Sequence, residues 1–126
     1  MQQLKFIILE GEYSLCRLAA SASIPSWIYD SDFYTISKSK NELSLICESK
    51  FIPADIRKSD NWKLLKIDAV LDLSLTGITA KFSKPLADAN VNLCVIATFD
   101  TDYIMVQTAK LDIAKAALQN EGFIVE

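Results

Sequence analysis

The sequence predicts an α+β protein made of two small modules, each with the element order β-α-β-β-α-β. In residues 61–126 the apolar residues change from a period of two to a helical period, and this change occurs twice. Residues 1–60 follow the same plan more loosely, as expected for a degenerate copy. No stretch rich in Gly, Ser or Pro separates the two parts, so we expect the modules to pack side by side as one body.

The first strand of the clearer module is expected over residues 62–71, where apolar and charged residues alternate. Over residues 75–86 the apolar residues recur at steps of three and four, which predicts a helix with Ser74 as its N-cap. Pro85 lacks an N–H group and is expected to bend this helix or restart it. Asn90 can end the helix, because asparagine tolerates the left-handed conformation.

Two further strands are expected at residues 91–97 and 103–106, which are apolar runs joined by the turn Asp100-Thr101-Asp102. Thr108 is expected to cap a second helix, whose inner face repeats at helical spacing. Gly122 is placed to end that helix, and the apolar residues that follow it predict a short last strand. This order is the split βαβ plan.

The N-terminal module is expected to open with strands at residues 6–9 and 13–18, which flank a tight turn at Glu10-Gly11-Glu12. A short helix can follow, with Pro25 in its first turn. Two later strands, near residues 33–37 and 43–47, are expected to form a hairpin.

Composition limits the possible functions. The chain has 126 residues, of which 51% are hydrophobic and 23% charged, and this balance is typical of a soluble globular protein. The net charge is −3 and the 13 basic residues form no stripe, so we expect no nucleic-acid partner. No apolar stretch reaches the roughly 20 residues of a membrane span, and the N-terminus lacks a signal-peptide layout. We therefore expect a cytoplasmic protein with no membrane partner.

The chain contains no histidine, which removes Ser–His and Cys–His nucleophiles and the usual imidazole metal ligand. Its three cysteines, Cys16, Cys47 and Cys94, are odd in number and widely spaced. We therefore expect them to be small buried hydrophobic residues that form no disulfide and bind no metal. An enzyme would have to use carboxylates, Lys, Tyr or Cys alone. We expect no catalytic residue and no cofactor.

A candidate binding site combines two turns, residues 71–77 and 98–104, which can lie close together at one edge of such a sheet. The first N–H groups of the helix, at residues 75–78, lack intrahelical acceptors and favour a carboxylate, and Gly77 has no side chain to block its approach. Asp102 can bind an ammonium group through charge-assisted hydrogen bonds. This combination suits a zwitterion such as an amino acid.

Each feature of this site also has a purely structural alternative. Asp and Thr are common turn formers, so residues 100–102 can simply shape a hairpin. Gly77 can equally serve close helix–sheet packing, and Trp27 and Trp62 are expected in the core or at a module interface. Asp72 and the two turn aspartates offer oxygen ligands to Ca²⁺ or Mg²⁺, but they do not follow the EF-hand spacing.

Over almost its whole length the chain resembles bacterial proteins that carry two ACT modules, a group related to the cytosolic arginine sensors of animals. The segments that carry the resemblance are residues 9–18, 62–65, 71–78 and 98–104. The resemblance implies a ferredoxin-like fold of antiparallel sheets with helices on one face, and a regulatory, small-molecule-binding role. It also implies that ACT modules pair side by side.

In related proteins the ligand lies at the interface of two ACT modules, between the loop before the first helix and the turn after the second strand. Carried over by matching positions, the implied ligand-binding residues are Leu73, Ser74, Thr76, Gly77, Thr98, Asp100, Thr101 and Asp102. Asp100 can bind a cationic side chain of the ligand or face water. The sequence thus predicts a non-catalytic sensor of an amino acid, in the form of a homodimer.

Two other functions are open. The module can lack a working pocket and serve only oligomerisation or protein interaction, with Phe33, Tyr34 and Trp62 supplying the contact. An acylphosphatase-like hydrolase on the same fold would need a phosphate cradle and a guanidinium clamp. The two arginines, Arg17 and Arg57, lie outside any Gly-rich loop, and the acidic turn would repel phosphate, which disfavours this enzyme.

Overall fold

The computed structural model describes residues 3–126, and their contacts divide the chain into two compact units. The large unit combines the chain up to Glu10 with Lys63–Glu126, and the small unit is Gly11–Trp62. The first strand therefore belongs with the C-terminal part of the chain, although the sequence grouped it within residues 1–60. That residues 1–60 are a degenerate copy of residues 61–126 stays a prediction.

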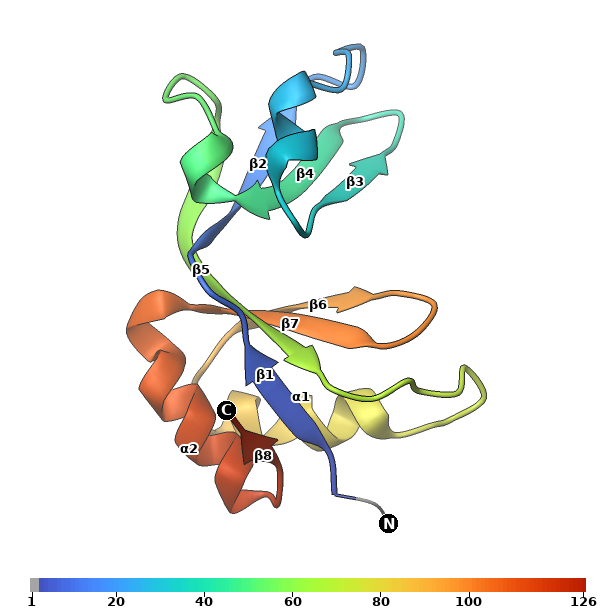
Figure 1. Ribbon diagram of the computed structural model, residues 1–126, viewed down its shortest axis with the longest axis vertical. Helices are drawn as coiled ribbons and strands as arrows, with labels where there is room; N and C mark the ends of the chain where they lie inside the picture. Colours follow the sequence, from blue (N-terminus) through green and yellow to red (C-terminus); the bar gives the residue numbers. More distant parts are fainter. Residues whose placement is uncertain (1–2) are drawn as a thin grey trace. The chain divides into compact units, whose positions relative to one another are not determined.

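The large unit contains the β-α-β-β-α-β order that the sequence predicted (Figure 1). Its elements are β1 (Lys5–Ile8), the end of β5 (Lys58–Ile67), α1 (Ile78–Asp88), β6 (Leu93–Ala97), β7 (Asp102–Gln107), α2 (Leu111–Asn120) and β8 (Ile124–Val125). The strands of this unit pair in the order β6-β7-β5-β1-β8. Strand β1 is thus an addition to the plan, antiparallel to β5 and parallel to β8.

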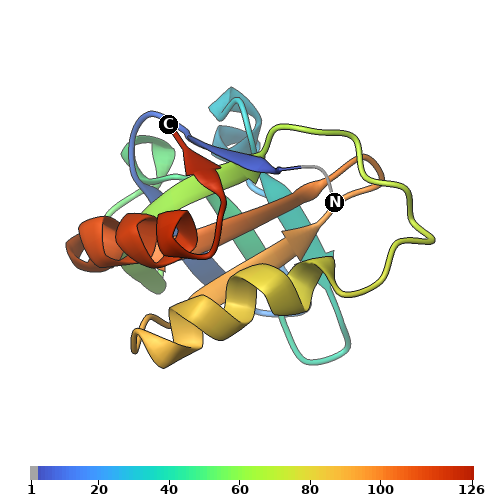
Figure 2. The ribbon, with the colours of Figure 1, turned by 90° about the horizontal axis from the view of Figure 1, so that it is seen from below.

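Both helices of the large unit pack on one side of its strands and share one core (Figure 2). The ring of Phe6 lies at the centre of this core, 5.8 Å from the ring of Phe82 and 5.3 Å from that of Phe123. Leu86 of α1 and Leu118 of α2 are fully buried in the same cluster. The predicted stripes are therefore the faces that the helices bury, except for Leu75, which precedes α1 and is exposed.

Several element boundaries differ from the prediction. Strand β5 ends at Ile67, and α1 begins only at Ile78 with Gly77 as its N-cap, so Ser74 is not the cap. Helix α1 runs without interruption through Pro85. Thr108 does not cap α2, because it opens a short 3-10 turn and the helix begins three residues later.

The helix ends agree with the prediction. Asn90 has a φ of 61° and Gly122 a φ of 103°, both in the left-handed region. At the end of α2 the Gly122 N–H donates to the Gln119 carbonyl, and the Phe123 N–H donates to the Leu118 carbonyl. These two bonds form a Schellman motif, which turns the chain into β8.

The small unit has the same order of strands, with much shorter helices. It consists of β2 (Tyr13–Leu18), the 3-10 helix η1 (Ser26–Asp30), β3 (Thr35–Lys38), β4 (Leu43–Glu48), the 3-10 helix η2 (Ser49–Phe51) and the start of β5. Its strands pair in the order β3-β4-β2-β5, all antiparallel. The predicted β3–β4 hairpin is confirmed, whereas β1 and β2, which flank the predicted tight turn, belong to different units.

The core of the small unit contains two of the three cysteines. Cys16 and Cys47 are buried beside Ile28, Leu43 and Leu45. Burial raises the pKa of the Cys16 thiol to about 11 and that of Cys47 to about 12, so both are uncharged at neutral pH. Their burial confirms the structural role predicted for Cys16 and Cys47, whereas Cys94, in β6, is only half-buried.

Candidate functional site

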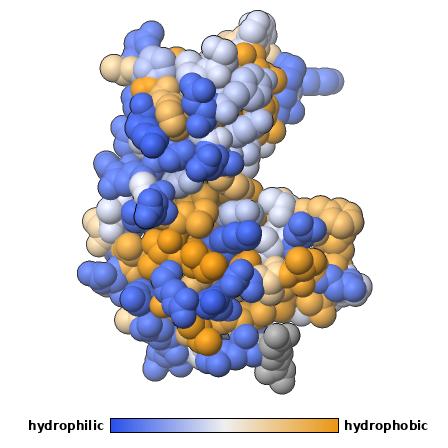
Figure 3. Space-filling view, in the orientation of Figure 1, coloured by the Kyte–Doolittle hydropathy of each residue, from blue (hydrophilic) through white to orange (hydrophobic). Residues whose placement is uncertain are grey.

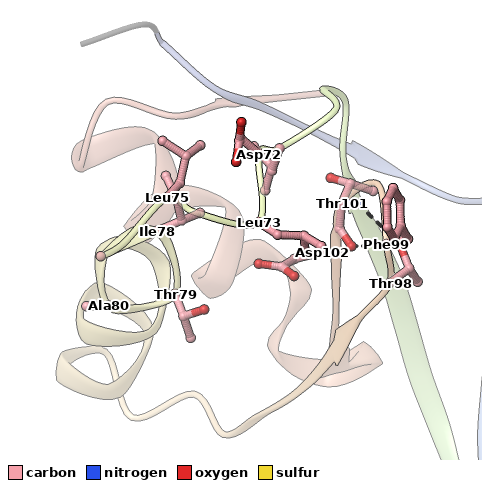
Figure 4. A pocket seen from close by; sticks show the side chains of 12 residues that line it. Asp72, Leu73, Leu75, Ile78, Thr79, Ala80, Thr98, Phe99, Thr101 and Asp102 are labelled. Atoms are coloured by element: carbon pink, nitrogen blue, oxygen red, sulfur yellow. Dashed lines mark hydrogen bonds between the residues drawn. The ribbon is translucent and has the colours of Figure 1, made fainter.

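A pocket of about 320 Å³ lies within the large unit, between the segment that leads into α1 and the turn that joins β6 to β7 (Figure 4). It is lined by Leu71, Asp72, Leu73, Leu75, Gly77, Ile78, Thr79, Ala80, Thr98, Phe99, Thr101 and Asp102. The two turns that the sequence singled out therefore meet at one cavity.

The segment before α1 is shaped by Asp72. Its Oδ1 accepts hydrogen bonds from the Ser74 N–H at 2.8 Å and the Ser74 hydroxyl at 2.7 Å, and its carbonyl accepts one from the Leu75 N–H at 3.0 Å. These bonds lower the pKa of Asp72, because they stabilise the charged carboxylate. The segment is tied to the opposite turn by a 2.6 Å hydrogen bond from the Leu71 N–H to the Asp100 carbonyl.

Gly77 is needed for its backbone conformation. Its φ is 82°, in the left-handed region, and a Cβ built on it would meet no atom within 4 Å. Tight helix–sheet packing therefore does not explain this glycine, whereas its role in leaving space for a ligand stays a prediction. Gly77 allows the chain to turn into α1 at Ile78.

The free N–H groups at the start of α1 are displaced from their predicted place. The sequence assigned them to residues 75–78, but the Leu75 N–H already donates to Asp72. The first turn of the observed helix is formed by Ile78, Thr79 and Ala80, and all three line the pocket. Because the first N–H groups of any α-helix lack intrahelical acceptors, this turn provides partial positive charge to the cavity.

The β6–β7 turn is held by two threonines. The Thr98 hydroxyl donates to the Thr101 carbonyl at 2.8 Å, and the Thr101 N–H donates to the Thr98 hydroxyl oxygen at 3.2 Å. The buried Thr101 hydroxyl donates to the Ile67 carbonyl at 3.0 Å, which fixes the turn to the end of β5. The next residue, Asp102, is half-buried, and its side chain extends from β7 toward α1 (Figure 4).

The structure brings together five of the eight predicted ligand-binding residues. Those that line the pocket are Leu73, Gly77, Thr98, Thr101 and Asp102. Ser74, Thr76 and Asp100 are exposed and lie outside the lining. Thr79 and Ala80 were missed because the helix begins three residues later than expected, and Phe99 because it looked like an ordinary turn residue. Binding by any of these residues stays a prediction.

The charges of the site are of two kinds. Asp72 and Asp102 are the acidic residues of the lining, and none of the described lining residues is cationic. Within the described lining, positive charge therefore comes from the start of α1. Over residues 3–126, no three His, Cys, Asp or Glu side chains come together as a set that could bind a metal ion.

The mouth of the pocket is unusually apolar for a protein surface. The lining residues Leu73, Leu75 and Phe99 are 70%, 53% and 81% exposed. Val70, which precedes the lining residue Leu71 in the sequence, is 80% exposed. We call these four residues the apolar rim. Figure 3 shows apolar surface at the edge of the large unit where Figure 1 places the β6–β7 turn and the segment before α1. Exposed apolar residues gathered in this way are typical of an interaction surface.

None of the helices described over residues 3–126 combines the length and apolar composition that a membrane crossing requires.

A family model described as an ACT domain matches residues 57–120, and a second model, for an N-terminal domain, matches residues 11–55. A comparison with curated proteins finds no significant match.

The chain is also similar to several solved structures. A protein from Agobacterium tumefaciens is 31% identical, with a TM-score of 0.93 over 100% of this chain and 94% of that one. A protein from Vibrio cholerae, titled a possible transport protein, is 23% identical, with a TM-score of 0.77 over 95% of this chain and 91% of that one. The regulatory subunit of aspartate kinase from Thermus thermophilus is 9% identical, with a TM-score of 0.61 over 94% and 93%. The last two likenesses concern the fold alone.

Proposed function

The chain belongs to the ACT-domain family, and on this premise we propose that it is a non-catalytic regulatory protein that binds a free amino acid in the pocket of the large unit. One observation carries the proposal. The half-buried carboxylate of Asp102 and the N-terminus of α1 face the same cavity from two sides. A zwitterion with its charges a few ångströms apart matches this pair.

The two charges of the ligand have separate partners in this proposal. The α-ammonium donates to Asp102, and the carboxylate accepts from the N–H groups of the first turn of α1. Charge-assisted hydrogen bonds of this kind each contribute about 1.5–3 kcal/mol, and the helix terminus adds about 0.3–1 kcal/mol. The Thr79 side chain, which lines the pocket, can supply a further hydroxyl.

The lining also suggests which side chain the ligand carries. Apolar residues form much of the cavity wall, and its second carboxylate, Asp72, would repel an acidic side chain. An apolar or cationic side chain fits this lining, the cation pairing with Asp72. A volume of about 320 Å³ lies at the lower end of the usual range for small-molecule sites, which begins near 300 Å³.

The apolar rim supports the further proposal that the working form is a homodimer. Every lining residue belongs to the large unit, so an ACT–ACT interface at this pocket requires a second module, which we propose is supplied by a second copy of the chain. The copy would cover the apolar rim and exclude water from the ligand. If the pocket were not used, the same rim would favour a module that only oligomerises.

The test is thermal unfolding of the full chain with each of the twenty amino acids. We expect one of them to stabilise the protein, by about 2.7 kcal/mol when present at 100 times its dissociation constant. Asp102→Asn should abolish this shift. Asp100→Asn is the matched control, because Asp100 is exposed and outside the lining, and it should leave the shift unchanged.

Two outcomes would contradict amino-acid binding: no stabilisation by any amino acid, or equal effects of the two substitutions. Sedimentation of wild type and Phe99→Ser then tests the dimer. A wild-type dimer that Phe99→Ser weakens, without ligand binding, would favour the oligomerisation function. A wild-type monomer at high concentration would contradict both the dimer and that alternative.

A further inference from the structure

A second pocket, of about 280 Å³, lies in the small unit on the face of its sheet that points away from the core. It is lined by Leu15, Cys16, Arg17, Glu42, Ser44, Arg57, Lys58 and Ser59. Arg17 is paired with Ser44 across β2 and β4, and Leu15 with Ser59 across β2 and β5. Directly paired residues share one face of a sheet, so these side chains stand together.

Along the strands, the core residues of the unit alternate with Leu15, Arg17, Ser44 and Ser59. Cys16 lies between Leu15 and Arg17 and is buried in the core, as is Leu45, its partner in β4. The pocket is therefore on the opposite face from η1, whose Ile28 packs into that core. This site is separate from the pocket of the large unit and shares no residue with it.

The two arginines of the chain both line this pocket. Their backbones are neighbours, because the Arg17 N–H donates to the Arg57 carbonyl at 3.0 Å. The Arg17 guanidinium donates one hydrogen bond to the Asn41 carbonyl at 3.0 Å, which leaves other N–H donors for a ligand. Among residues 3–126, neither guanidinium forms an ion pair with a carboxylate at an N···O distance of 4.0 Å or less. Lys5, Lys50 and Lys84, in contrast, each form such a pair.

Two guanidinium groups in one pocket repel each other unless an anion lies between them. The hydroxyls of Ser44 and Ser59 add donors to the same face. Trp62 Nε1 donates to Ser59 Oγ at 3.0 Å, so the proton of that hydroxyl remains available to a ligand. Glu42 is the one acidic residue in the described lining, and its charge competes with a bound anion.

We propose that this pocket binds a small oxyanion, the phosphate group or paired carboxylates of a metabolite. A guanidinium matches two oxygens of such a group through parallel N–H donors, whereas a lysine provides only a point charge. The proposal gives the small unit a ligand site of its own. It does not depend on the function proposed for the large unit.

The experiment is a titration of the full chain with inorganic phosphate and, separately, with malonate, followed by amide signals in nuclear magnetic resonance. We expect saturable shifts at Arg17, Ser44 and Ser59 with at least one of the two anions. Saturation by phosphate alone would assign the pocket to phosphorylated ligands, and by malonate alone to polycarboxylates. Arg57→Gln should weaken the affinity by about ten- to hundredfold, the loss expected for a charge-assisted pair.

Lys40→Gln is the matched control, because it removes the same charge from the same unit at an exposed residue outside the lining. It should change the affinity less than about twofold, the size of a screened, long-range charge effect. Glu42→Gln should tighten binding, a gain that a damaged fold cannot imitate. Absence of saturation with both anions, equal losses from Arg57→Gln and Lys40→Gln, or no gain from Glu42→Gln would overturn the proposal.

Discussion

The β6–β7 turn of the large unit and the β3–β4 turn of the small unit are built in the same way. In the large unit the Thr98 N–H donates to the Thr101 carbonyl, and the Thr101 N–H donates back to the Thr98 hydroxyl oxygen. In the small unit the Ser39 N–H donates to the Glu42 carbonyl, and the Glu42 N–H donates back to the Ser39 hydroxyl oxygen. Each pair encloses two residues and aligns the following strands in the same register.

The residue that follows each turn differs. Asp102 opens β7, opposite Ala97, and Leu43 opens β4, opposite Lys38. Leu43 is 1% exposed and belongs to the core of the small unit, whereas Asp102 is half-buried and lines a pocket. One position of a shared plan therefore contributes to stability in one unit and to a candidate site in the other.

The first crossover connection, between the first and second strands of each unit's plan, also differs between the two units. In the large unit the first crossover ends in α1, an eleven-residue helix whose N-terminus faces the pocket. In the small unit the corresponding crossover contains only η1, a 3-10 helix of five residues. A single 3-10 turn has little of the macrodipole of a longer helix. An anion site in the small unit must therefore use side chains, and the pair Arg17 and Arg57 provides them.

The largest expected effect comes from exchanging the two residues that follow the turns. Leu43→Asp should lower the free energy of unfolding by about 4 kcal/mol or more, because it removes buried apolar contacts and places a carboxylate in the core. Asp102→Leu should change it by no more than about 0.5 kcal/mol, because a half-buried site at a pocket tolerates either side chain. Urea unfolding measures both. Similar losses in the two variants would show that the turns are not functionally divergent.

A smaller effect is expected at Gly77, the N-cap of α1. Gly77→Ala should cost about 1 kcal/mol, because alanine resists a φ of 82° although its methyl group has open space. Gly77→Asn should cost less, since asparagine tolerates this region. The equivalent position in the small unit is Pro25, the N-cap of η1, whose φ of −69° needs no glycine. Thermal unfolding of the two variants would contradict this account if alanine were harmless or asparagine equally costly.

The sequence predicted those parts of the fold that depend on local patterns. Gly122 ends α2 in the predicted conformation, because a glycine after a helical stripe is a local signal. The apolar stripes of α1 and α2 were recognised for the same reason. The place of β1 was not predictable in this way. Its residue Phe6 pairs with Ile67 of β5 and Val125 of β8, which are distant in the sequence, and only the assembled sheet determines that pairing.

The candidate site was predicted only in part, for a related reason. Leu75 is spaced correctly for the inner face of α1, yet it is 53% exposed and precedes the helix. The apolar spacing thus predicts a core position for a residue of the apolar rim and a helix start three residues before the observed one. The bonds between Asp72 and Ser74 hold this segment outside the helix. An Asx turn of this kind competes locally with helix formation, and a period of apolar residues does not reveal it.

The smallest expected effect concerns the charge of Asp72. Hydrogen bonds from Ser74 lower the pKa of this exposed carboxyl below its ordinary value of 3.8. Because the pKa is lowered in the folded state, the charged form of Asp72 stabilises the turn above pH 3.8. This contribution is lost as the pH falls through the folded-state pKa.

Ser74→Ala should raise the pKa of Asp72 toward its ordinary value. A titration of the Asp72 carboxyl carbon by nuclear magnetic resonance, in the wild type and in Ser74→Ala, measures the change. An unchanged pKa of Asp72 in Ser74→Ala would show that the Ser74 hydroxyl does not stabilise the carboxylate, and the backbone N–H bonds would then hold the turn without it.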